Sequence, residues 1–196
     1  MDPIARRRTV ALAGHAGDAA TARGYLGDDD ASVRATALAA LERAGDLQPD
    51  DLVTALDDGS PVVRQRAAEL AAGRPGDVAP TLLTTLDDPE PAVVETAAWA
   101  SGERVPAESG AVTALSAIAR QHDDPLCREA AVAALGALAD PAGLPAILDA
   151  THDKPAIRRR AVLALAPFDG PEVDAALERA LEDRDWQVRQ AAEDLR

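Results

Sequence analysis

The sequence predicts an all-α fold in which helix pairs stack into one right-handed superhelix. A short motif recurs roughly every 30 residues: an apolar residue, then Arg, then small apolar residues three and four positions later. A fixed period of this size is typical of a solenoid built from one repeated supersecondary unit. Apolar residues make up 47% of the sequence and aromatic residues only 2%, so the core is built from Ala, Leu and Val, which suits closely packed helices.

The Arg of the motif lies near the start of the second helix of each repeat, which we call helix B. In the second copy, Val33 and Arg34 are followed by Ala37 and Leu38. The copies are anchored at positions 6, 34, 64, 95, 128, 158 and 189, and position 95 carries Glu in place of Arg. Because the copies follow one another along the whole chain, we expect residues 1–196 to form a single solenoid.

Each helix B has a recognisable beginning and a buried stripe. Asp124-Pro125 and Ser60-Pro61 are examples of a favoured N-cap followed by Pro, which suits the first helical position. Positions −1, +3, +4 and +7 relative to the anchor are apolar, which is the spacing of an amphipathic helix. Pro91 sits one place earlier than its counterparts, and with the anchor at 95 we assign Trp99 to the core.

Helix A precedes each cap, and Gly and Pro punctuate the turns. A helix B at the start of the chain, with no helix A before it, is interpreted as an N-terminal capping helix. A trimmed chain or a fragment of a larger repeat array would begin in the same way. We therefore expect about six helix pairs plus the capping helix, and a local bend in the long connection 102–110. The candidate A helices are 17–27, 49–57, 76–87, 109–121, 142–151 and 171–182.

Acidic residues recur six positions before several of the anchor arginines. With these motifs the chain resembles the HEAT repeat family, and more closely its short phycobilisome-lyase-type subclass, over essentially its whole length. The resemblance implies an armadillo/HEAT-type superhelix in which the turn Asp and the helix B Arg bond across neighbouring repeats. It also implies that Glu95 interrupts this ladder at the third repeat. The ladder residues are Asp28, Arg34, Asp58, Arg64, Asp183 and Arg189.

Catalytic and cofactor signatures are weak, and we predict no catalytic residue and no cofactor. His122 and His152 occupy equivalent turns one repeat apart, so they are candidate metal ligands, although each could simply fill a turn position. Cys127 stands where other copies have Val or Ile, so we interpret it as a core residue. The HEAT-like hydroxylases of deoxyhypusine hold two irons with His-Glu pairs, and this sequence has no His-Glu dipeptide.

The charge and the helix B face favour a binding protein. The net charge of −14 disfavours nucleic acid and anionic membranes, which require clustered Lys and Arg. We predict a non-enzymatic cytoplasmic scaffold that binds a protein or peptide through its concave helix B face, where arginine side chains bind carboxylates of the partner. An enzyme or enzyme subunit of the phycobilin-lyase-like or metal-dependent type is the alternative. The predicted partner-binding residues are Arg66, Glu69, Thr96, Arg159, Arg160 and Leu163.

Overall fold

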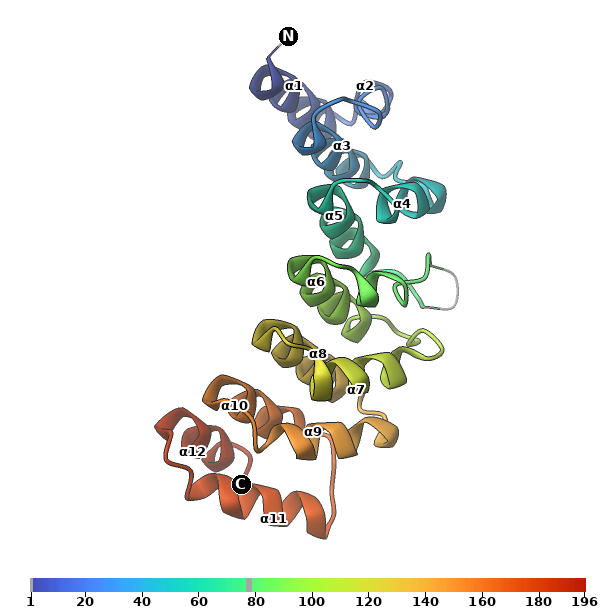
Figure 1. Cartoon of the computed structure of the whole chain (residues 1–196). Coiled ribbons are helices and arrows are strands. Elements are labelled where there is room, and N and C mark those ends of the chain that lie inside the picture. Colours follow the sequence, from blue (N-terminus) through green and yellow to red (C-terminus); the bar gives the residue numbers. More distant parts are fainter. Residues whose placement is uncertain (1, 77–78) are drawn as a thin grey trace.

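The computed structural model describes residues 2–76 and 79–196, and within them it contains helices and connections but no strand. The helices stack into a bowed column with the helix B elements on its inner side and the helix A elements on its outer side (Figure 1). Buried apolar residues form a continuous core from Val10 in the first helix to Ala176 in the eleventh. A smaller cluster around Val188 closes the last repeat. The predicted all-α superhelix is confirmed.

Helix B occurs in every repeat, and the predicted Asp caps form at Asp30 and Asp124, whereas Ser60 occupies the N-cap position of its helix without a side-chain capping hydrogen bond. Asp30 accepts hydrogen bonds from the backbone N–H groups of Ser32 and Val33, and Asp124 accepts one from Leu126. These caps satisfy N–H groups that have no partner inside the helix. The helix B elements are α1 (Pro3–Ala16), α3 (Ala31–Ala44), α5 (Pro61–Ala71), α6 (Pro91–Gly102), α8 (Pro125–Leu138), α10 (Pro155–Ala164) and α12 (Trp186–Glu193).

Five of the six expected A helices are present, within a few residues of the predicted bounds. A single 3-10 turn, η2 (Pro141–Gly143), leads into the fourth of them. The helix A elements are α2 (Ala19–Arg23), α4 (Pro49–Leu56), α7 (Ala111–Gln121), α9 (Leu144–Ala150) and α11 (Pro171–Leu181).

The predicted helix A at 76–87 is wrong for the described part of that range. Residues 79–84 are irregular, and only the 3-10 turn η1 (Thr85–Asp87) follows them before α6. Residues 77 and 78 lie outside the described residues. Regular helix resumes at Pro91, so the missing helix is the outer element of the third repeat.

Two side chains from the 102–110 connection supply hydrogen bonds to this irregular segment and to the end of α5. Arg104 has a completely buried side chain, and its guanidinium donates to the carbonyls of Pro80 (2.9 Å) and Ala71 (3.3 Å). Glu108 accepts from the backbone N–H of Leu82 (2.9 Å) and pairs with Arg104 (3.1 Å). Burial lowers the pKa of Arg104, and the Glu108 carboxylate opposes that shift. Side chains thus satisfy backbone groups that a helix would satisfy internally.

Glycine allows three helix B pairs to approach each other closely. A Cβ added at Gly102 in α6 would lie 2.7 Å from the Cα of Ala134 in α8. The same distance separates an added Cβ at Gly14 from Ala40, and the Gly136–Ala164 contact is equally tight. At these junctions the backbones themselves are in contact, and no other residue type fits without displacement.

Candidate partner-binding groove

The register of α6 differs by one residue from the sequence prediction. Pro91 is the first residue of α6, as Pro61 is of α5, and Arg64 stands three residues after Pro61. The equivalent residue of α6 is therefore Val94, which is only 1% exposed, and not Glu95. Glu95 takes the position that Gln65 has in α5, on the exposed side of the helix.

The same shift moves Trp99 out of the core. Trp99 is 46% exposed, and it stands in the position that Glu69 has in α5. The prediction that Trp99 fills a core position is wrong, because one residue of offset rotates a helix position by about 100°. Pro91 was the signal that could have found this, since it fixes the first turn of the helix.

Trp99 lies in a groove of about 660 Å³ that follows α5, α6, α8 and one residue of α10. We call it the helix B groove. Leu126, which is 55% exposed, also lines it. The other lining residues are Gln65, Glu69, Glu95, Thr96, Gly102, Glu103, Glu129, Ala130, Ala133, Ala134, Ala137 and Arg160.

The charges of the helix B groove are mostly negative. Four carboxylates line it against one guanidinium, that of Arg160, which lies 3.5 Å from Glu129. Glu69 is also paired, with Arg66 at 2.6 Å. Glu95 and Glu103 line the groove on either side of Trp99, and no ion pair involves them among the residues that the structure describes.

Of the six predicted partner-binding residues, four line two neighbouring hollows, and Arg66 and Arg159 line neither. Glu69, Thr96 and Arg160 line the helix B groove. Leu163 lines an adjacent hollow of about 530 Å³ that it shares with Arg160. Arg159 is exposed on α10 and lines neither hollow. Arg66 and Arg160 are each paired with a Glu, so of the three arginines only Arg159 has no acidic partner among the described residues.

The structure places His122, His152 and Cys127 in different surroundings. The ring Nδ1 of His122 accepts a hydrogen bond from the backbone N–H of Asp124 (3.1 Å), whereas His152 is exposed. Across 2–76 and 79–196, no three His, Cys, Asp or Glu side chains are placed to hold a metal ion. Cys127 is buried, its thiol donates to the carbonyl of Pro91 (3.2 Å), and burial raises its pKa to about 11.

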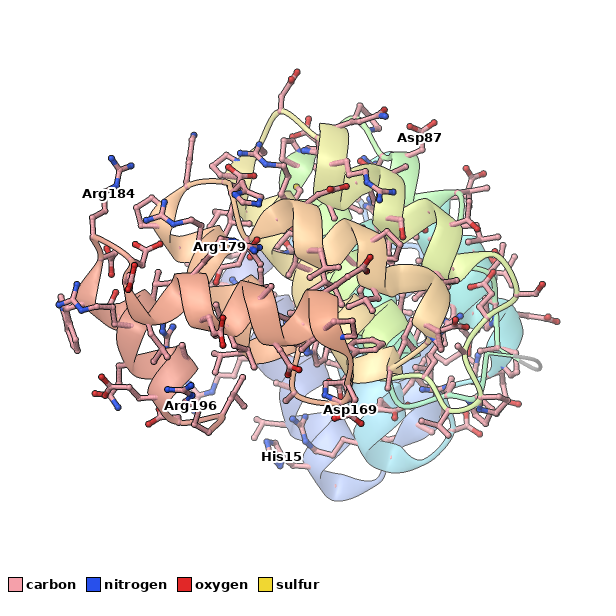
Figure 2. All side chains as sticks on the ribbon, turned by 90° about the horizontal axis from the view of Figure 1, so that it is seen from below. His15, Asp87, Asp169, Arg179, Arg184 and Arg196 are labelled. Atoms are coloured by element: carbon pink, nitrogen blue, oxygen red, sulfur yellow. The ribbon has the colours of Figure 1, made fainter. Side chains whose placement is uncertain are left out.

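A further hollow of about 380 Å³ lies at the C-terminal end, between the α9–α10 turn and the last helix pair. His152, Arg179 and Arg184 are among its lining residues. Arg184 extends from the turn before α12 away from the helices, while Arg179 lies on α11 (Figure 2).

Arg–Asp ion pairs join successive turns along the stack. Five of the Arg side chains near the start of a helix B reach the Asp of the following turn, and several also donate to a carbonyl of their own turn, as Arg34 does to Asp28 (2.8 Å). Arg189, in the last helix, donates to the carbonyl of Asp183 (2.7 Å). The pairs are Arg6–Asp28 (2.9 Å), Arg34–Asp58 (2.7 Å), Arg64–Asp88 (2.6 Å), Arg128–Asp153 (2.7 Å) and Arg158–Asp183 (2.7 Å).

The series of pairs has one gap in the described part of the chain. We call each of these Arg–Asp ion pairs a rung. Val94 occupies the Arg position of α6, so no rung links α6 to the turn that holds Asp123. Hydrogen bonds from Arg64 hold the pKa of Asp88 below its usual value, and Arg128 does the same for Asp153. A bidentate Arg–carboxylate pair is geometrically demanding, so each rung constrains the angle between neighbouring repeats.

Comparison with solved structures supports the stacked-repeat fold. The chain is 19% identical to a designed armadillo repeat protein in complex with the peptide (KR)4, over 89% of this chain and 96% of that one, with a TM-score of 0.67. It is 18% identical to YIBA of Escherichia coli, over 87% and 67% of the two chains (TM-score 0.64). Human deoxyhypusine hydroxylase in complex with glycerol is also similar (19% identity, 99% and 78% coverage, TM-score 0.52). At these identities the likeness concerns the fold.

Comparison of the sequence with protein families is more specific. No curated protein matches the chain. No helix in the described ranges has the length and apolar character needed to cross a membrane. The sequence model for HEAT repeats matches residues 49–120 and 112–196, which together cover more than half of the chain. The chain therefore belongs to the HEAT repeat family.

Proposed function

We propose that this protein is a non-enzymatic scaffold that binds a partner protein or peptide in the helix B groove. The observation that carries the proposal is the exposure of Trp99 and Leu126 together inside a groove on the inner side of the stack. Large exposed apolar side chains in a concave surface are typical of binding sites, and Trp is enriched among residues that dominate binding energy.

Two further observations support this proposal over an enzyme. The designed armadillo repeat protein binds a peptide, and we extend peptide binding to this chain as part of the proposal. Cys127 has a raised pKa and a buried thiol, so it lacks the thiolate character of a nucleophile. We retain the cytoplasmic location and the phycobilisome-lyase-type subclass as proposals, on the single cysteine and on the repeat motif respectively.

The test is selection of a random peptide library against wild type and the Trp99→Ala variant. We expect enriched peptides that bind wild type and lose most of their affinity for Trp99→Ala, because an anchor Trp contributes about 2 kcal/mol or more to binding. Trp186→Ala is the matched control, since Trp186 is 64% exposed on α12 and does not line the groove. Peptides that bind both Trp variants equally well would place the binding surface elsewhere.

A further inference from the structure

The helix B groove carries a linear arrangement of three side chains along α6. Glu95, Trp99 and Glu103 are spaced four residues apart, so they lie on one face of the helix region and its C-terminal cap, about one turn from each other. All three line the groove. The indole ring therefore has a carboxylate on each side along the groove.

The two carboxylates beside Trp99 differ from the other acids of the groove. Glu69 and Glu129 are neutralised by Arg66 and Arg160, whereas Glu95 and Glu103 form no ion pair with any described residue. They sit on a chain whose net charge is already −14, so their mutual repulsion is not relieved within the molecule. An incoming cation would relieve it.

The chemistry that matches this arrangement is that of an arginine side chain. A guanidinium stacks on an indole face by a cation–π interaction and donates hydrogen bonds in its own plane. Carboxylates on either side of the ring are placed to accept them, and this pattern favours Arg over the smaller, more strongly hydrated ammonium of Lys. Leu126, on α8, offers an apolar contact for the neighbouring residue of an extended segment.

We infer that the helix B groove binds a basic, arginine-containing segment of a partner protein, with one guanidinium stacked on Trp99 between Glu95 and Glu103. This inference rests on the proposed function and specifies its partner chemistry. It replaces the expectation that the groove accepts carboxylates, because the arginines on which that expectation depended are paired or lie outside the groove.

Direct binding tests the inference with a matched charge control. The probe is a short fluorescein-labelled peptide of alternating Arg and Ser, measured by anisotropy with wild type, with Glu95→Gln/Glu103→Gln and with Glu178→Gln/Glu182→Gln. The last variant removes the same charge from exposed positions on α11 and its C-cap. We expect about tenfold weaker binding for the groove variant and less than about twofold for the control. Equal weakening would mean that net charge alone attracts the peptide, and would overturn the inference.

Tryptophan fluorescence gives a second, local readout. In a Trp186→Phe background Trp99 is the sole tryptophan, because the sequence has two. We expect the Arg peptide to change the Trp99 emission and the corresponding Glu peptide to leave it unchanged. An unchanged emission with bound Arg peptide would overturn the placement on Trp99. Library peptides that depend on Trp99 but carry no Arg or Lys would overturn only the inference, whereas a library without Trp99-dependent peptides would overturn the proposed function as well.

Discussion

The second repeat, formed by α4 and α5, and the third repeat, which ends with α6, cover their B helices by different means. In the second, helix α4 covers α5 and makes its backbone hydrogen bonds internally, while the pair of Arg34 and Asp58 fixes the turn between them. In the third, the outer element is irregular at 79–84, and the buried Arg104 with Glu108 supplies the hydrogen bonds. The difference shows that a repeat can lose its outer helix without losing its place in the stack, provided that side chains satisfy the exposed backbone groups.

The largest effect is expected for Arg104→Ala, which removes the centre of the third repeat's network. The substitution leaves Glu108 charged and partly buried and leaves the carbonyl of Pro80 without its donor. Breaking a buried ion pair from one side costs about 3–5 kcal/mol, so we expect a loss of that order in the free energy of unfolding. Urea denaturation followed by circular dichroism measures it.

The control for Arg104→Ala is Arg120→Ala in the regular part of the stack. Arg120 pairs with Asp149 at 2.7 Å, but the two side chains are 38% and 62% exposed. We expect a change below about 1 kcal/mol, as is typical of surface ion pairs. Similar losses in the two variants would show that burial does not distinguish the two kinds of pair.

The next effect concerns the rungs and their gap. Asp88→Asn removes the carboxylate that accepts two hydrogen bonds from Arg64, and we expect a loss of about 1.5–3 kcal/mol in unfolding free energy. Asp123→Asn changes an exposed Asp of the turn that receives no rung, and we expect less than about 0.5 kcal/mol. Equal effects at the two positions, measured by urea denaturation, would contradict a stabilising role for the rungs.

Gly102→Ala tests the close junction between the irregular repeat and the one that follows. The added methyl would lie 2.7 Å from the Cα of Ala134, so the two helices must separate, and we expect a loss of about 1–3 kcal/mol. In Gly59→Ala the added methyl meets nothing within 4 Å. Thermal unfolding of both variants should lower the melting temperature for position 102 alone.

The smallest effect is a difference in pH dependence. Hydrogen bonds from arginine lower the pKa of four turn carboxylates in the folded chain, those of Asp58, Asp88, Asp153 and Asp183. A folded-state pKa below the unfolded value of about 3.9 gives stability that is complete above that pH and is lost as the pH falls through the folded pKa. We expect the urea concentration at the unfolding midpoint to decrease as the pH is lowered below about 4. This decrease should be less steep for Asp88→Asn than for wild type.

The fold could be predicted from the sequence because the same residue pattern recurs in each repeat. Helix B caps, the Arg position and five A helices follow from local rules that operate within a few residues. The third repeat failed those rules for two physical reasons. First, Arg104 donates a hydrogen bond to the carbonyl of Pro80, 24 residues away in the sequence, and no local pattern predicts such a contact. Second, the motif around Val94 is shifted by one residue, and only the position of Pro91 indicates this shift. The same shift concealed the exposure of Trp99, and with it the character of the groove.

The backbone contact between Gly102 and Ala134 has a consequence for recognition, because both residues line the helix B groove. A surface whose floor is main chain against main chain has few rotamers to lose when it is covered. At this part of the groove the conformational entropy lost on association therefore falls on the incoming segment, and a segment that is already extended in solution would bind more tightly than a flexible one of the same composition.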